Sequence, residues 1–142
     1  MHLGALNLSD LMLSLWWGTI NCTQPDDKAT WDWAVLRGEV WQQHGKAVAD
    51  CLHYLPSSFD CPPCNIAEKL TSSYKAWEFL QYLYGLSPGL LLGVLPDVYY
   101  THYCKLVFRM RLMNQYRITL TNVQDAQLVS RTYYFIEVDG MR

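Results

Sequence analysis

The segment from Tyr74 to Tyr103 constrains the fold more than any other part of the chain. It holds eight of the twenty aromatic residues, gathered around a link that is rich in glycine and proline. Such a cluster can be a ligand cage, a platform on which nucleic-acid bases stack, or the interior of a helical hairpin. One helical stripe of this region contains Leu70, Tyr74, Trp77, Leu80 and Tyr84. This spacing favours a hairpin whose aromatic residues face inward.

The first twenty residues predict one short helix. Ser9 or Asp10 is suited to cap it, and Gly18 is suited to end it. No Lys or Arg precedes the apolar stretch, and Asp10 interrupts it, which is unlike a secretory signal peptide. The longest apolar runs are far shorter than the roughly 18 to 20 residues that a membrane-spanning helix needs. We therefore expect an intracellular protein that does not enter a membrane.

A long amphipathic helix is predicted over residues 31–52, because apolar or small residues recur there at steps of three and four. Gly38 and Gly45 lie on its inner stripe. Glycine lowers helix propensity by about 1 kcal/mol relative to alanine, but it permits close approach of a neighbouring helix. Both glycines therefore predict close packing against another helix.

A Pro- and Ser-rich connector at residues 54–64 precedes the aromatic segment. Asn65 and Glu68 then have the spacing of a capping box, in which each residue satisfies a free polar group at the start of a helix. Gly85 stands where a glycine commonly ends a helix. One helix is therefore expected from Asn65 to about Tyr84.

Two further helices are predicted after a short apolar link. Pro96 suits the first turn of a helix that continues to Met113. The motif at residues 121–124 is a second capping box and opens a last helix, while residues 132–138 could instead be extended. The expected fold class is all-α, an irregular bundle of about five helices.

The four residues Cys61-Pro62-Pro63-Cys64 have the two-residue gap of a zinc or redox cysteine pair. Cys51 and His53 are close in the sequence, so these two residues with Cys61 and Cys64 are the candidate metal ligands. The chain has no second cysteine pair with this spacing, and its five cysteines are an odd set. Free thiols in a reducing compartment are therefore the favoured interpretation, with no metal or other cofactor in this chain.

No catalytic signature stands out elsewhere in the sequence. The chain has no Gly-x-Ser-x-Gly nucleophile elbow and no phosphate-binding loop, and its acidic residues include no obvious metal-binding pair on a strand. The net charge of −2 excludes a strongly basic nucleic-acid-binding arm. We therefore assign no catalytic residue.

The most basic stretch of the chain lies on the helix that follows Pro96. Its members are Lys105, Arg109 and Arg111, with Arg117 just beyond the helix. These four residues are the candidates for contact with DNA phosphates. The alternative, which the helical pattern favours, is the solvated face of an amphipathic helix.

Four long blocks follow one another along the chain. They read MHLGALNLSDLMLSLWWGTI, ATWDWAVLRGEVWQQHGKAVAD, YLPSSFDCPPCNIAEKLTSSYKAWEFLQYLYGLSPGLLLGVLPDVYY and YCKLVFRMRLMNQYRIT. Together they resemble the transposase-like proteins of fungal CACTA-type elements, the Plavaka group of basidiomycetes. The resemblance covers about residues 1–127.

The resemblance implies a long parent protein with a catalytic core like that of RNase H. In such a core an Asp-Asp-Glu triad binds two divalent metals and cuts and joins DNA. This chain would map to a helical insertion region, with the catalytic aspartates upstream of Met1 and the glutamate downstream of the matched blocks. The parent would contact DNA through those missing parts, and a transposase fragment would act in the nucleus.

Departures from the family pattern are also informative. Trp17, Cys61 and Cys64 stand where the family has arginine, and each is a single C-to-T step from an arginine codon. This trend fits mutational decay of a silenced element. The sequence after Gln127 no longer follows the family, so residues 1–127 are expected to be a helical transposase-like region and residues 128–142 a divergent C-terminal tail.

The sequence thus predicts a truncated, catalytically incomplete fragment of a DNA transposase. The alternative is a non-enzymatic helical module that interacts with protein or DNA, in which leftover apolar surface binds a partner or a second copy of the chain. A third hypothesis is a small zinc-dependent nucleic-acid binder that uses Cys51, His53, Cys61 and Cys64.

Overall fold

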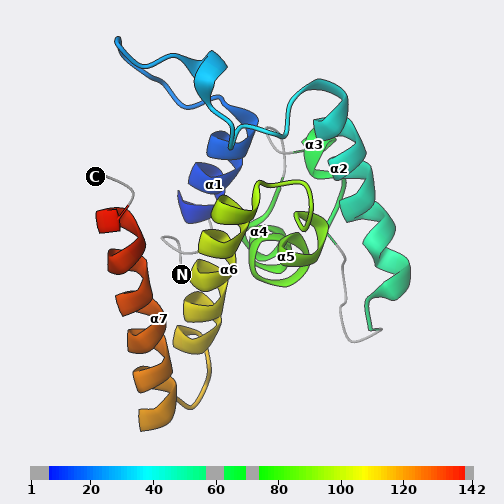
Figure 1. Cartoon of the computed structure of the whole chain (residues 1–142). Coiled ribbons are helices and arrows are strands. Elements are labelled where there is room, and N and C mark those ends of the chain that lie inside the picture. The colour runs from blue at the N-terminus through cyan, green and yellow to red at the C-terminus, as the bar shows by residue number, and fades with distance from the viewer. Residues whose placement is uncertain (1–6, 57–62, 70–73, 140–142) are drawn as a thin grey trace.

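The computed structural model describes residues 7–56, 63–69 and 74–139, and this part of the chain is helical without any strand. Figure 1 shows short helices packed together at the centre of the molecule and a long helical hairpin at one side. The prediction of an all-α fold is confirmed.

Helix α1 spans Leu8–Trp17 and ends at Gly18, as predicted. Gly18 has a φ of 75°, and its N–H donates to the carbonyl oxygen of Leu15 at 3.0 Å. This left-handed conformation is one that glycine adopts without steric cost. The predicted cap at Ser9 or Asp10 is wrong, because the helix begins before them and Ser9 is buried within its first turn.

The prediction of one helix over residues 31–52 is wrong at both ends. Helix α2 spans Gly38–Asp50, and 3-10 turns occupy Lys28–Thr30 and Cys51–Tyr54. Residues 31–37 form a loop between the first of these turns and α2. The N–H of Leu36 donates to the carbonyl oxygen of Trp16 at 2.9 Å, so a contact with α1 replaces a bond within a helix.

Gly45 confirms the expected close approach of two helices. A Cβ atom at this position would collide with Asn65 Oδ1 and would lie 2.8 Å from the backbone nitrogen of Ala67. Gly38 does not have this role. It starts α2 with a φ of 54°, and no atom of the described residues lies within 4 Å of a Cβ built there.

The predicted helix from Asn65 to Tyr84 is divided. Its first part is α3 (Ile66–Lys69), where the Asn65 cap is confirmed: Asn65 Oδ1 accepts from the N–H of Ala67 at 3.0 Å, and Asn65 Nδ2 donates to Glu68 Oε1 at 2.9 Å. Helix α4 (Ala76–Gln81) starts separately. The buried Glu78 carboxylate accepts from the N–H groups of Lys75 and Cys64, at 2.8 and 3.1 Å, and so fixes this new start.

Gly85 does not end a helix. Helix α4 continues into a π-helical turn over Tyr82–Leu86 and then into α5 (Ser87–Leu90). Residues 87–95, predicted to be a link, are therefore helical in their first half. The buried side chains also differ from the predicted stripe: Phe79, Tyr82 and Leu83 are buried, while Trp77 and Leu80 of that stripe are half-buried.

Helix α6 spans Asp97–Met113 and starts directly after Pro96, in agreement with the prediction. Helix α7 spans Leu120–Asp139 and lies antiparallel to α6 at the edge of the molecule (Figure 1). Its start is fixed by Thr119 with Asn122 rather than by Thr121 with Gln124, the ends of the predicted box. Asn122 Oδ1 accepts from the N–H of Thr119 at 2.9 Å. Residues 132–138 are helical and not extended.

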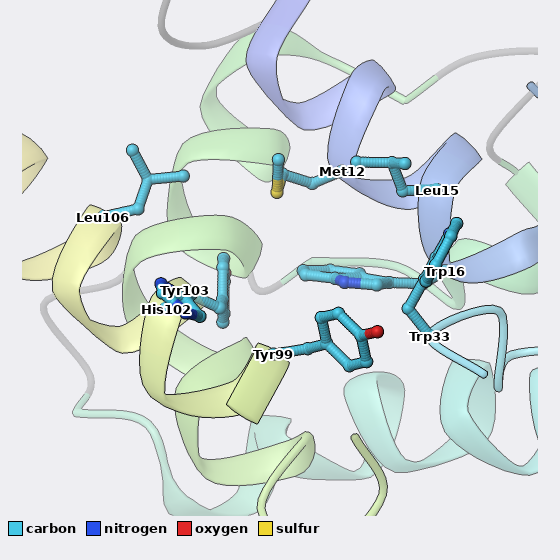
Figure 2. A pocket seen from close by; sticks show the side chains of 8 residues that line it. All are labelled: Met12, Leu15, Trp16, Trp33, Tyr99, His102, Tyr103 and Leu106. Atoms are coloured by element: carbon cyan, nitrogen blue, oxygen red, sulfur yellow. The ribbon is translucent and has the colours of Figure 1, made fainter. Parts of the chain in front are cut away.

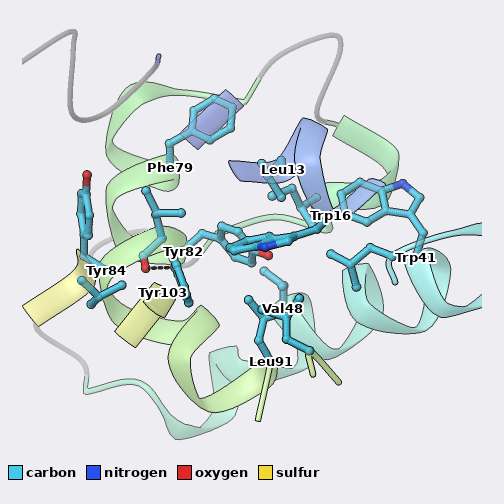
Figure 3. Close-up of a cluster of buried hydrophobic side chains, with 14 residues drawn as sticks. Leu13, Trp16, Trp41, Val48, Phe79, Tyr82, Tyr84, Leu91 and Tyr103 are labelled. Atoms are coloured by element: carbon cyan, nitrogen blue, oxygen red, sulfur yellow. Dashed lines mark hydrogen bonds between the residues drawn. The ribbon is translucent and has the colours of Figure 1, made fainter. Parts of the chain in front are cut away.

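The core joins residues from most of these helices. Figure 3 shows Trp16 of α1 between the side chains of α2 and those of the α4–α5 segment and α6. Trp16 meets Tyr103 edge to face, with 4.8 Å between ring centroids, and Trp17 stacks on Trp41 at 5.1 Å. All eight aromatic residues of the Tyr74–Tyr103 segment are buried or half-buried, which confirms that they face inward.

Candidate functional site

A pocket of about 330 Å³ lies between α1, the loop of residues 31–37 and α6. Figure 2 shows side chains of α1 on one side and of α6 on the other, with Trp33 of the loop closing the end. The lining residues are mostly aromatic or aliphatic: Met12, Leu15, Trp16, Trp33, Tyr99, His102, Tyr103 and Leu106. The pocket is therefore an apolar site with aromatic walls.

The loop that carries Trp33 is fastened on both sides. Trp33 stacks on Trp31, with ring centroids 5.5 Å apart, and meets the ring of Tyr99 edge to face at 5.7 Å. Trp31 Nε1 donates to Asp26 at 3.1 Å, and the Tyr99 hydroxyl donates to Asp32 at 2.8 Å. The hydrogen bond to Asp32, together with burial, raises the pKa of Tyr99. These contacts hold the wall of the pocket in place without a ligand.

Polar atoms are few in this pocket. The Tyr103 hydroxyl bonds with Ser87 and donates to the carbonyl oxygen of Leu83. The indole nitrogen of Trp33 is buried, and it has no hydrogen-bond partner among the described residues. Because this nitrogen has almost no accessible surface, it does not face the open space of the pocket.

Sequence reasoning missed this pocket because it placed residues 31–52 in one helix. Neighbours on opposite sides of a helix do not line one cavity, and only the observed loop brings Trp33 to Tyr99. The closely spaced Trp31 and Trp33 were the one feature of the sequence that could have indicated an aromatic site in this segment.

A second polar pair lies inside the core. His44 Nε2 and the Tyr82 hydroxyl are 2.7 Å apart, and both side chains are buried. Burial lowers the pKa of His44 from 6.5 to about 4, because charging the ring inside the core is unfavourable. Burial likewise raises the pKa of Tyr82. Each group thus stays neutral near pH 7 and satisfies the other.

The four predicted DNA-contact residues do not form one surface. Lys105 and Arg109 are one helical turn apart and line two grooves beside α7, and both are half-buried. Arg111 is exposed on another face of α6, and Arg117 is exposed in the link to α7. Of these four candidates, Arg111 and Arg117 are therefore the ones exposed to a phosphate.

The predicted metal ligands are only partly described. Cys51 is half-buried and His53 is exposed in the 3-10 turn after α2, while Cys64 precedes α3 and lies 3.6 Å from Lys69 Nζ. Burial and the neighbouring Asp50 raise the pKa of Cys51. Cys61 lies outside the described residues. In the described ranges, no three His, Cys, Asp or Glu side chains are grouped so that they could hold a metal.

Among the described helices, none combines the length and the apolar character needed to cross a membrane. No protein-family model matches this sequence, and neither the curated proteins nor the solved structures gave a match. Three features of the described structure could contact another molecule. They are the aromatic pocket, the basic residues of α6 and the exposed apolar side chains of the α6–α7 hairpin.

Proposed function

We propose that this chain is the helical, catalytically incomplete part of a DNA transposase that resembles the fungal Plavaka group. One observation carries this proposal: each of the four family-like blocks supplies residues of the common core. The contributions, in block order, are Leu13 and Trp16, then Trp41 and Val48, then Tyr82 and Leu91, then Tyr103 and Val107. Blocks that share one core constrain one another's side chains, because each fills space left by the others.

The catalytic chemistry would belong to other parts of the parent protein. The resemblance implies an RNase H-like core with an Asp-Asp-Glu triad and divalent metal, and none of the matched blocks carries a residue of that triad. The role of the present chain would be to pack against that core and to support DNA binding in the nucleus.

The genomic sequence around this chain tests the proposal directly. We expect the flanking DNA, once translated, to contain an open frame with aspartate motifs upstream and a glutamate motif downstream of the matched blocks. The transposase origin would be contradicted if the flanking DNA encoded unrelated proteins. Intact neighbouring genes on both sides that lack these motifs would contradict it as well.

DNA contact is tested by salt-dependent binding of the full chain to a duplex. Each phosphate that a basic side chain neutralises contributes about −0.9 to the slope of log K against log salt. The double variant Arg111→Ala, Arg117→Ala should therefore reduce the slope by about 2. Lys46→Ala removes an exposed charge from α2 and is the matched control, with an unchanged slope expected. Absence of binding at low salt would reject DNA contact.

A non-enzymatic interaction module is the second candidate, and the surface of the α6–α7 hairpin favours it. Several large apolar side chains are exposed there: Phe108, Met113, Ile118, Leu120 and Leu128. Phe108 lines one groove beside α7, and Met113 and Ile118 line another, so apolar surface that could form an interface lies along the hairpin. In this function the hairpin would bind a second copy of the chain.

Sedimentation velocity over a hundredfold range of protein concentration tests self-association. We expect a concentration-dependent dimer that the double variant Leu120→Ser, Leu128→Ser weakens. Leu52→Ser removes an exposed leucine from the 3-10 turn after α2, outside the hairpin, and should leave the dimer intact. A chain that stays monomeric over the whole range would exclude this function.

A further inference from the structure

We propose that the Tyr103 hydroxyl of α6 is the latch of a conformational device: it holds the π-helical turn of Tyr82–Leu86 closed, and this turn opens when the hydroxyl is withdrawn. The inference is independent of the proposed transposase origin. It rests on the backbone hydrogen bonds around the turn, on the position of Pro88 and on the burial of the carbonyl group of Leu83.

Pro88 interrupts the backbone hydrogen bonds of this segment. Helix α4, the π-helical turn and α5 follow one another without a break, and Pro88 lies in α5. An N–H at position 88 would donate to Tyr84 in an α-helix and to Leu83 in a π-helix, but proline has no N–H. The N–H of Ser87 donates to the carbonyl oxygen of Tyr82. Neither position 87 nor position 88 therefore gives the Leu83 carbonyl a backbone donor.

The carbonyl group of Leu83 obtains its donors from side chains instead. Leu83 is 0% exposed, so solvent does not reach this carbonyl. The Ser87 hydroxyl donates to it at 2.9 Å, and the Tyr103 hydroxyl donates to it from α6. A buried carbonyl without a donor costs free energy comparable to a lost hydrogen bond. The two hydroxyls therefore allow the turn to keep its shape inside the core.

Tyr103 is the one of these two donors that comes from another helix. Its side chain is buried, and burial raises the pKa of its hydroxyl, which therefore keeps its proton near pH 7. Its ring meets that of Trp16 edge to face at 4.8 Å and forms part of the wall of the aromatic pocket (Figure 2). Because the ring and the hydroxyl are one rigid group, a displacement of the ring at the pocket wall would withdraw the hydroxyl from the turn.

Either hydroxyl can satisfy the Leu83 carbonyl alone. Each of them is hydrogen-bonded to this carbonyl, and the two also contact each other. Tyr103→Phe and Ser87→Ala each leave one donor and should keep the turn closed, whereas the double variant leaves no donor and should open it. The effect of the double variant should therefore be much larger than the sum of the two single effects.

Hydrogen exchange of the backbone N–H at position 87, measured by NMR on the ¹⁵N-labelled full chain, reports opening of the turn. Each single variant should raise the exchange rate by less than about fivefold, and the double variant by about tenfold to a hundredfold. This exchange should depend only weakly on added denaturant, because a local opening exposes little surface. The N–H of Val48 in α2 provides the steep dependence of global unfolding for comparison. An equally steep dependence at position 87, or a double variant that exchanges no faster than the single variants, would overturn the inference.

Tyr100 supplies a matched control on the same helix. Its hydroxyl donates to the carbonyl oxygen of Pro88 at 2.8 Å and not to that of Leu83. The pair Ser87→Ala, Tyr100→Phe removes the same atoms as the double variant but leaves the Tyr103 donor in place. Position 87 should then exchange as it does in Ser87→Ala alone, and exchange as fast as in the double variant would contradict a specific role of Tyr103.

Pro88→Ala keeps the inference testable if the double variant does not fold. It restores an N–H that can donate to the Leu83 carbonyl, so the hydroxyls of Ser87 and Tyr103 should no longer be needed. The triple variant Ser87→Ala, Pro88→Ala, Tyr103→Phe should therefore fold and exchange at position 87 like Pro88→Ala alone. A triple variant that is unfolded, or that exchanges as fast as the double variant, would overturn the inference.

Discussion

Helix α6 belongs to two hairpins that differ in how their apolar residues are used. Toward α4 and α5, its residues Tyr103 and Val107 are buried, and the Tyr103 hydroxyl is satisfied by Ser87 and the carbonyl oxygen of Leu83. Toward its other end and α7, Phe108 and Met113 remain exposed. The first hairpin is the interior of this chain, whereas the second presents apolar surface that the chain itself does not cover.

The difference teaches that a high content of aromatic and apolar residues does not by itself define a core. In the first hairpin the buried tyrosine hydroxyls have partners: Tyr82 pairs with His44 of α2, and Tyr103 with Ser87 and the carbonyl oxygen of Leu83. In the second hairpin, several large apolar side chains remain exposed to solvent. Substitutions in the two hairpins should therefore differ strongly in their cost.

The largest expected effect is at Tyr82. The side chain is 0% exposed and pairs with His44, so Tyr82→Ala removes a large buried ring and leaves a buried imidazole without its partner. We expect a loss of about 4 kcal/mol in the free energy of unfolding. Tyr116→Ala, at a position that is 99% exposed, should change it by less than about 0.5 kcal/mol. Denaturant unfolding measures both, and equal losses would contradict the contrast.

Gly45 gives the next largest effect. A methyl group there would collide with the Asn65 side chain and crowd the backbone of Ala67, so Gly45→Ala should destabilise the fold by about 2 to 3 kcal/mol. Gly89 is the control, because it is exposed in α5 and no described atom lies near a Cβ built there. Gly89→Ala should stabilise by up to about 1 kcal/mol through helix propensity. A neutral Gly45→Ala variant would show that α2 and α3 can separate at little cost.

His44 of α2, which pairs with Tyr82 of the first hairpin, makes the stability of the fold depend on pH. Its pKa falls from 6.5 to about 4 on folding, so between these values the unfolded chain binds more protons. The free energy of unfolding should therefore decrease as the pH falls, by about 2 kcal/mol between pH 7 and pH 5. Thermal or denaturant unfolding across this range measures the decrease. His44→Gln cannot titrate, and a variant with the same pH dependence would assign the effect to other groups.

The smallest effect on stability is expected in the second hairpin. Leu120 and Leu128 are 74% and 66% exposed, so replacing either with serine should change the free energy of unfolding by less than about 0.5 kcal/mol. A loss of more than 1.5 kcal/mol from either change would mean that α7 packs more closely in solution than its exposed side chains indicate.

Several local features could be predicted from residues that are near one another in the sequence. The end of α1 at Gly18, the cap at Asn65 and the start of α6 after Pro96 are all as expected. Each depends on the conformational preference of one residue or on a hydrogen bond that spans a few residues. Helical spacing also indicated that the aromatic segment is enclosed, but it did not give the buried face, because Phe79 and Tyr82 lie off the predicted stripe.

The candidate site could not be predicted in the same way. Lys105, Arg109, Arg111 and Arg117 are adjacent in the sequence but point to different surroundings, because α7 covers one face of α6 and leaves another open. The aromatic pocket escaped prediction because helical periodicity was extended through residues 31–37. The pattern in that segment is ambiguous, and a contact with α1 decides it.

The sequence by itself determined that this protein is helical and that the aromatic residues between Tyr74 and Tyr103 are largely enclosed, since periodicity and caps act over one or two turns of chain. Only the tertiary structure decided where the long helices break and which side chains line the pocket. The hydrogen bond from the Leu36 N–H to the Trp16 carbonyl and the one from the Cys64 N–H to the Glu78 carboxylate join residues far apart in the chain. Such bonds stabilise a local conformation only once the chain has folded, which is why the pocket at Trp33 is a product of the fold.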